Sequence, residues 1–192
     1  MIALPKLAIL VSGNGSNLQS IIDHIANQKL KAEICIVVSN KENAYALQRA
    51  QNAKIPTFVL SHKDHKERQS FDRALIEQLK KTGAQWIVLA GFMRILGKDF
   101  ISAFEGKIIN IHPSYLPQFP GLNAIEQALD SGAKQTGVTV HFVDEGVDAG
   151  PVILQERVVI DPTDDLESLT AKIQVLEHQI YPKALQKVLW GN

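Results

Sequence analysis

An amide and an imidazole stand two residues apart where an apolar run of the sequence meets a proline-rich segment. These residues are Asn110 and His112, and Pro113 follows directly. Residues i and i+2 of a strand point to the same face of a sheet, so both side chains are expected to converge on one point. A hydrogen-bond donor beside a proton carrier suits a reaction that passes through an oxyanion. The alternative is a polar strand end that caps the following loop.

A second group of candidates is the acidic, glycine-rich segment 143–151, which contains Asp144, Glu145 and Asp148. Carboxylates can bind a metal ion, but no histidine or cysteine accompanies these at ligand spacing, and Mg²⁺ sites usually need substrate phosphate as well. We therefore predict no metal. Two interpretations remain: an exposed hairpin loop, or a loop in which one carboxylate polarises His112.

Glycines follow the first predicted strand in segment 12–17, Ser-Gly-Asn-Gly-Ser-Asn. Glycine lets the backbone approach a ligand closely, and the N–H groups at a helix N-terminus attract anions, so the segment predicts a phosphate site. A dinucleotide fingerprint is disfavoured, because Leu18 stands where the third glycine belongs and no acidic residue ends the second strand, where Ser39 and Asn40 stand. A Walker A loop is excluded, because no Gly-Lys-Ser/Thr follows. The alternative is a glycine turn without a ligand.

Two further features carry residues in unusual places. In segment 91–96, Phe92 and Met93 suggest a flat apolar pocket with Arg94 nearby, although the same residues could pack at the start of a helix. Glu177 lies at the edge of the apolar stripe of the last predicted helix. A carboxylate there costs free energy unless it is paired or bound to something. It is therefore either a rim residue in an ion pair or a ligand contact.

The elements that must position these residues follow from hydrophobic periodicity. In the first half, strands are predicted at 6–11, 33–38, 56–60 and 85–90, and helices at 16–26, at 43–54 and after Ser61. Ser61 is expected to cap the third helix. The alternation of strands and helices predicts an α/β fold with a doubly wound, mostly parallel, twisted sheet and flanking helices.

The second half is expected to contain strands at 107–111, 138–143 and 152–160, and a short helix at 123–131. In the last helix, apolar residues recur at alternating spacings of three and four. Thr163 is its expected N-cap, and Pro182 is expected to kink or interrupt it. Because no linker or internal repeat divides the sequence, we predict one domain over 1–192, with an N-terminal half of about 1–100 and a C-terminal half of about 101–192.

Composition limits the class of protein. The 192 residues are 45% hydrophobic and 21% charged, which is typical of a globular domain with a sizeable core. The 20 basic and 20 acidic residues cancel, so no global attraction to nucleic acid or an anionic membrane is expected. A single cysteine, Cys35, excludes an internal disulfide. No signal peptide or run of the ~20 apolar residues of a membrane span is recognised, and a cytoplasmic location is expected.

Five segments, taken together and in order, resemble the phosphoribosylglycinamide formyltransferase family, which are folate-dependent enzymes of purine biosynthesis. They lie at 12–17, 89–96, 110–117, 119–122 and 148–151. The Asn-x-His-Pro-Ser element and the distal aspartate are also found in the wider formyltransferase group. The Ser-Gly-Asn-Gly-Ser-Asn loop and the Pro-Gly-Leu element point to the glycinamide ribonucleotide enzymes.

The resemblance implies the formyltransferase fold, with an antiparallel C-terminal strand. It implies transfer of a formyl group from 10-formyltetrahydrofolate, as co-substrate, to the amine of 5-phosphoribosylglycinamide, without a metal. Partners would be small molecules only, with no nucleic acid or membrane, and the protein would be a monomer or weak homodimer.

By position, the resemblance also assigns roles to residues of this sequence. Asn110, His112 and Asp148 match the catalytic trio. Gly15, Ser16 and Asn17 would hold the phosphoribosyl substrate, and Glu177 would contact its ribose or glycinamide end. The folate pocket would be lined by Arg68, Met93, Arg94, Ile95, Leu96, Asn110, His141 and Asp144. The bond between Leu116 and Pro117 is expected to be cis.

The sequence departs from the family pattern at residues 123–125, and other functions are also considered. The family often has a His-Thr-His pattern after Pro-Gly-Leu, whereas this chain has Asn123, Ala124 and Ile125, which removes or moves a positive or hydrogen-bonding contribution. Hydrolysis of the same folate would need the trio but not a phosphate loop. A tRNA formyltransferase would need an RNA-binding surface, which neither length nor charge indicates. A non-catalytic nucleotide-binding module or a dinucleotide oxidoreductase is disfavoured by the missing third glycine.

Overall fold

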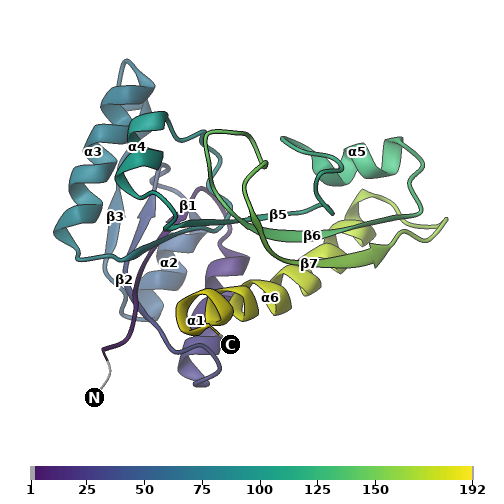
Figure 1. Cartoon of the computed structure of the whole chain (residues 1–192), viewed down its shortest axis with the longest axis horizontal. Coiled ribbons are helices and arrows are strands. Elements are labelled where there is room, and N and C mark those ends of the chain that lie inside the picture. Colours follow the sequence, from purple (N-terminus) through teal and green to yellow (C-terminus); the bar gives the residue numbers. More distant parts are fainter. Residues whose placement is uncertain (1–2, 192) are drawn as a thin grey trace. The chain divides into compact units, whose positions relative to one another are not determined.

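The computed structural model describes residues 3–191, and the chain divides into two compact units, Met1–Ile109 and Asn110–Asn192. The first unit alternates strands and helices (Figure 1). Its elements are β1 (Lys6–Val11), α1 (Ser16–Ala26), β2 (Glu33–Ser39), α2 (Tyr45–Asn52), β3 (Thr57–Val59), the 3₁₀ turn η1 (His62–Asp64), α3 (Arg68–Lys81), β4 (Trp86–Leu89) and α4 (Lys98–Ala103).

The strands of the first unit run in the order β3-β2-β1-β4, and all of them pair in parallel. Within β1, Ile9 lies opposite Val37 of β2 on one side and Val88 of β4 on the other. Every β1 residue after Lys6 is buried, as expected for a strand covered on both faces. Figure 1 shows α1 and α2 on one face of this sheet and α3 and α4 on the other. The predicted doubly wound parallel sheet is therefore confirmed for this unit.

Two local predictions for the first unit were wrong. Ser61 does cap a helical segment, since its hydroxyl accepts the Lys63 N–H at 3.2 Å, but that segment is the single turn η1. The helix α3 begins only at Arg68, because the polar stretch before it offers no apolar face to bury. The six-residue α4 was not predicted, because it is too short to show a helical period.

The second unit is built around an antiparallel hairpin. Its elements are β5 (Ile108–His112), whose last three residues open the unit, α5 (Ala124–Asp130), β6 (Gln135–Phe142), β7 (Val152–Val159) and α6 (Leu166–Trp190). The strands follow the order β5-β6-β7, and β6 pairs antiparallel with β7 from Gln135 opposite Val159 to His141 opposite Val152. The expected antiparallel C-terminal strand is therefore confirmed. The helix α6 packs on both hairpin strands and on α5.

The start of α6 differs from the prediction. Asp165, not Thr163, is the N-cap: its Oδ1 accepts the Ser168 N–H at 2.8 Å, and the Ser168 hydroxyl accepts the Asp165 N–H at 3.0 Å. This reciprocal pair satisfies two backbone donors, which a threonine two residues earlier cannot do. Pro182 lies buried inside α6, and the helix continues to Trp190 without interruption.

Candidate active site

The end of β5 places two polar side chains beside β6. Nδ2 of Asn110 lies 3.3 Å from Nε2 of His141. Nε2 of His112 donates to the carbonyl oxygen of Phe119 at 2.8 Å, and its Nδ1 lies 3.3 Å from Oδ2 of Asp148. Both ring nitrogens of His112 therefore face oxygen acceptors, and only the doubly protonated ring can donate to both. The orientation of the His112 ring is therefore fixed by one backbone oxygen and one carboxylate.

Asp148 lies between two buried histidines. Its Oδ2 faces His112, its Oδ1 lies 3.6 Å from Nε2 of His141, and the Gly121 N–H donates to Oδ2 at 2.9 Å. Burial by itself raises the pKa of the Asp148 carboxyl, but the hydrogen bonds from His141 and Gly121 and the charge of His112 outweigh burial and lower the pKa below its ordinary value. The cluster therefore holds a carboxylate between two imidazoles at neutral pH.

The β6–β7 loop is shaped around this carboxylate. Asp148 has a φ of +51°, in the left-handed region that aspartate tolerates better than most residues. A Cβ at Gly150 would overlap the carbonyl oxygen of Phe142, so the chain can close this tightly only with glycine there. Because strained backbone collects at functional sites, the geometry supports a specific task for Asp148.

The segment 113–123 contributes backbone groups instead of side chains. The Phe119 carbonyl accepts from His112, and the Gly121 N–H donates to Asp148. The segment is held in turn by Gln127 of α5, whose Nε2 donates to the carbonyl of Leu122 at 2.7 Å and to that of Pro120 at 3.2 Å. The Leu116–Pro117 bond in this segment is cis, as expected. Asn123, the first residue of the departure from the family pattern, is the N-cap of α5 with a φ of +57°.

In the first unit, the loop 12–17 joins β1 to α1. Gly15 is the N-cap of α1, with a φ of +75°, and no side chain caps the helix there. A Cβ on Gly15 would lie 2.5 Å from the Cβ of Ala46, so only glycine fits. The Arg49 guanidinium donates to the Asn14 carbonyl at 2.9 Å and to its side-chain oxygen at 2.8 Å. The loop therefore has a fixed shape, a helix start without a side-chain cap and a neighbouring cation, which together suit an anion.

The segment 91–97 follows β4 at the same carboxyl edge of the sheet. Met93 and Ile95 are exposed, Arg94 is half-buried and Leu96 is buried. The hydroxyl of Ser12, which begins the loop 12–17, accepts the Met93 N–H at 2.8 Å. The two loops predicted to bind different ligands are thus in direct contact.

The structure brings together one group of expected site residues within each unit. In the second unit, Asn110, His112, His141 and Asp148 form a connected cluster. Two expected binding residues of that unit lie outside it: Asp144 is exposed and accepts the Gly146 N–H at 2.9 Å, and Glu177 is buried on α6. In the first unit, loops 12–17 and 91–97 meet through Ser12, and Arg68 is the exposed first residue of α3.

Sequence reasoning missed four contributors to these sites. The carbonyl of Phe119 and the N–H of Gly121 are backbone groups, and residue type gives no signal for them. Ser12 and Asp72 each hold a backbone N–H of segment 91–97. A possible signal for Asp72 was its place between Phe71 and Leu75, on the apolar face of α3, where a carboxylate needs a buried partner.

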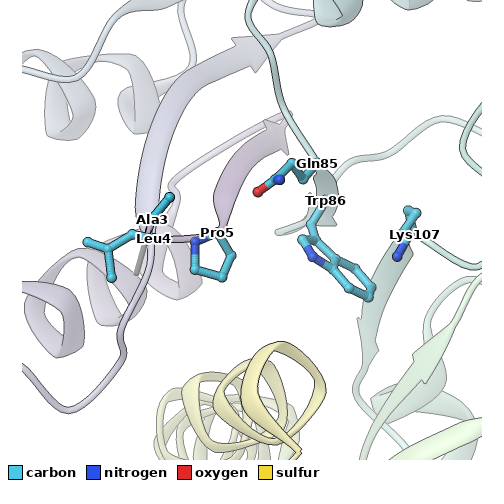
Figure 2. Close-up of a pocket in the computed structure, with 6 residues that line it drawn as sticks. All are labelled: Ala3, Leu4, Pro5, Gln85, Trp86 and Lys107. Atoms are coloured by element: carbon cyan, nitrogen blue, oxygen red, sulfur yellow. The ribbon is translucent and has the colours of Figure 1, made fainter. Parts of the chain in front are cut away.

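A cavity of about 510 Å³ lies elsewhere in the first unit. Figure 2 shows its lining, formed by Ala3, Leu4, Pro5, Gln85, Trp86 and Lys107. It lies at the amino ends of β1 and β4, and the Lys107 ammonium sits 4.3 Å from the centre of the Trp86 ring. Loops 12–17 and 91–97 follow the carboxyl ends of these strands, where parallel sheets bind their ligands. The cavity therefore lies at the opposite edge of the first unit's sheet from these two loops.

Residues 3–191 hold neither a metal-binding cluster of side chains nor a membrane-spanning helix. No group of three or more His, Cys, Asp or Glu side chains is arranged to hold a metal ion. No helix in this range is long and apolar enough to cross a membrane.

Comparison with known proteins identifies the family. The family model for formyl transferase matches residues 5–185. The chain belongs to the formyl transferase family. A phosphoribosylglycinamide formyltransferase of Bacillus subtilis is 41% identical over 189 residues, covering 98% of this chain and 97% of that protein. The glycinamide ribonucleotide transformylase 1 of Symbiobacterium toebii has a TM-score of 0.96 at 40% identity, covering 98% of this chain and 89% of that one.

Other relatives of this formyl transferase are much longer proteins. The trifunctional purine biosynthetic protein adenosine-3 of Drosophila melanogaster is 47% identical over 189 residues. The match covers 97% of this formyl transferase but only 14% of the longer protein. The TM-score and coverage of the solved structure confirm the predicted fold class over nearly the whole chain.

The geometry of this formyl transferase defines what its cluster can do. Asn110 offers an amide, and the His112 ring is held in place between the Phe119 carbonyl and the Asp148 carboxylate. The Asn110 amide can donate a hydrogen bond to an oxyanion, which forms when a nucleophile adds to a formyl group. The Asp148 carboxylate can then support proton movement through the imidazole.

Proposed function

We propose that this formyl transferase moves the formyl group of 10-formyltetrahydrofolate to the amine of 5-phosphoribosylglycinamide, in de novo purine biosynthesis. The observation that carries the proposal is the cluster of Asn110, His112 and Asp148, held by hydrogen bonds and ion pairing at the end of β5. The B. subtilis relative, which the match covers over nearly its full length, is named phosphoribosylglycinamide formyltransferase, and this name supports the same substrate. The longer relatives, named as purine biosynthetic proteins, support the pathway.

In the proposed mechanism, the glycinamide amine attacks the formyl carbon. The formyl oxygen becomes an oxyanion, which the Asn110 amide and the His112 ring stabilise. The bond from the formyl carbon to N10 of the folate then breaks, and the proton lost by the amine is delivered to that nitrogen. Asp148 orients His112 and assists this proton transfer through water. Oxyanion donors are typically worth ~3–4 kcal/mol each, and proton transfer ~10²–10⁴-fold in rate.

The amine substrate is proposed to bind the first unit through its phosphate. Gly15, Ser16 and Asn17 supply the start of α1, and Arg49 adds a positive charge and holds the preceding Asn14 in place. Glu177 is proposed to contact the ribose or glycinamide end. A phosphate-binding loop gives a hydrolase no advantage, so this loop favours transfer to a phosphorylated amine.

The folate is proposed to bind segment 93–96, with further contacts from the other residues that the resemblance assigns. The exposed side chains of Met93 and Ile95 fit this role, because a flat heteroaromatic ring needs an apolar surface. Beyond segment 93–96, the proposed contacts are Arg68, Asn110, His141 and Asp144. We further propose that the enzyme needs no metal, acts in the cytoplasm on small molecules alone, and is a monomer or weak homodimer.

The first experiment follows 10-formyltetrahydrofolate by absorbance, with purified protein, with and without 5-phosphoribosylglycinamide. We expect deformylation of the folate only when the amine substrate is present. Deformylation without the amine would replace transfer by hydrolysis, and no reaction in either case would leave a binding protein instead of an enzyme. A catalytic control is His112→Ala, which should abolish the reaction in the presence of both substrates.

A further inference from the structure

Segment 92–96, which we call the apolar wall, exposes two large apolar side chains and partly buries the charged residue between them. Met93 is 66% exposed and Ile95 is 65% exposed. Between them, Arg94 points inward, and its Nε is buried with no hydrogen-bond partner among the described residues. Exposing two large apolar side chains and burying part of a guanidinium both cost free energy. The segment would relax to the opposite arrangement unless other groups held it.

Two buried side chains hold this segment by backbone N–H groups, one of Met93 near its start and one of Gly97, which directly follows it. At one end, the Ser12 hydroxyl accepts the Met93 N–H at 2.8 Å and donates to Oδ1 of Asn40 at 2.6 Å. At the other end, Oδ2 of Asp72 accepts the Gly97 N–H at 2.8 Å. Ser12 is 3% exposed and Asp72 is 2% exposed, so neither bond competes with bulk water.

The environment of Asp72 shows that its carboxyl is committed to this contact. A Cβ at Gly97 would lie 2.6 Å from Oδ2 of Asp72, so the backbone approaches the carboxyl as closely as glycine permits. Burial raises the pKa of Asp72 above its ordinary value, and the Gly97 N–H and the charges of Arg68 and Arg94 only partly offset it. The guanidinium of Arg94 also lies 6.0 Å from the centre of the Phe71 ring on α3. The other carboxyl oxygen, Oδ1, is buried with no hydrogen-bond partner among residues 3–191, so the Gly97 N–H is the hydrogen bond that the structure gives this buried carboxyl.

We propose that Ser12 and Asp72 are positioning residues that pin the two ends of the apolar wall, so that Met93 and Ile95 stay turned outward to receive a flat apolar ligand. The proposal rests on the proposed function in one respect, the identity of that ligand as the formyl folate. It gives a task to Asn40, which stands where a dinucleotide-binding protein would have an acid and here orients the Ser12 hydroxyl. Ser12 also begins the loop 12–17, so one hydroxyl supports both proposed binding loops.

The anchors are tested first without any ligand, by amide hydrogen exchange on the whole protein. Ser12→Ala should speed exchange at Met93 at least 10-fold and leave Gly97 within about 2-fold, whereas Asp72→Ala should do the reverse. The matched controls are Ser39→Ala, which removes a buried serine at the end of the next strand, and Asp99→Ala, which removes an exposed carboxylate from α4. Neither control should change either amide. Unchanged exchange at both amides, or equal loss at both in every variant, would overturn the proposal.

The second test separates positioning from general loss of structure. Asp72→Ala should raise the KM for 10-formyltetrahydrofolate about 10-fold, with kcat and the KM for the amine substrate within about 3-fold of wild type. Asp72→Asn keeps an acceptor oxygen for Gly97 and should restore most of the folate KM. Equal changes in both KM values, or no rescue by asparagine, would refute a positioning role. If the wild-type protein shows no transfer, the proposed function fails, and the exchange result still decides the anchors.

If Asp72→Ala does not fold, Ser12→Ala provides the same comparison at the other end of the apolar wall. It should raise the KM for 10-formyltetrahydrofolate and speed amide hydrogen exchange at Met93 alone. A folate KM equal to that of Ser39→Ala would refute the role of Ser12.

Discussion

Replacing Asp148 by asparagine removes the negative charge of the cluster and keeps its shape. The carboxylate lies 3.3 Å from Nδ1 of His112, and when the ring carries a proton in the reaction this separation corresponds to about 5 kcal/mol between unit charges at an effective dielectric constant of about 20. An asparagine can still accept the Gly121 N–H, so part of the local structure remains. We expect a net loss of about 3–4 kcal/mol of transition-state stabilisation, which is about 10²–10³-fold in kcat.

The assay is steady-state transfer at neutral pH, with thermal unfolding measured on the same samples. Asp148→Asn should unfold within a few degrees of wild type, because its acceptor for Gly121 is retained. Glu145→Gln is the matched control, since it removes an exposed carboxylate from the same loop and should leave kcat unchanged. A kcat for Asp148→Asn within 3-fold of wild type would show that His112 does not depend on this charge, and the proposed mechanism would be wrong.

Three further predictions concern the stability of the β6–β7 loop and of the loop 12–17. Because the folded-state pKa of Asp148 is lowered, its contribution to the free energy of unfolding should be complete above about pH 5 and lost as pH falls below 4. In urea unfolding from pH 3 to 6, Asp148→Asn should therefore lose less free energy of unfolding on acidification than wild type does. Gly15→Ala should lower the free energy of unfolding by about 1–3 kcal/mol and raise the KM for the amine substrate, because the new Cβ would meet Ala46 and the φ is positive. Gly13→Ala is the control: nothing lies within 4 Å of its new Cβ, so it should unfold like wild type. Gly150→Ala should cost a similar free energy, and a kcat that stays at the wild-type value would show that the β6–β7 loop does not position Asp148.

The parts of this fold that the sequence predicted are those with a local physical signal. Apolar runs and helical periods located β1, α1 and β4, because burial on a sheet or a helix face imposes a repeat on neighbouring residues. The same local reasoning failed where a capping residue could serve either of two helical segments, or where two residues could each cap one helix. Ser61 has the right side chain for a cap, but only the tertiary arrangement decides that it caps one turn and that α3 starts later. Asp165 prevailed over Thr163 because Ser168 stands at the right distance to reciprocate.

For the candidate site, the sequence alone determined which side chains are available and that Asn110 and His112 share a face, since strand geometry repeats every two residues. It also indicated, through the resemblance, that Asp148 belongs with them. Only the tertiary structure decided that both nitrogens of His112 meet acceptors, because one acceptor is a backbone carbonyl and the other comes from a hairpin loop distant in sequence. The same holds for the outward turn of Met93, which depends on a hydroxyl from β1's end and not on its neighbours. The chemistry of each side chain follows from its residue type, but a hydrogen bond between distant segments forms only when folding brings those segments together.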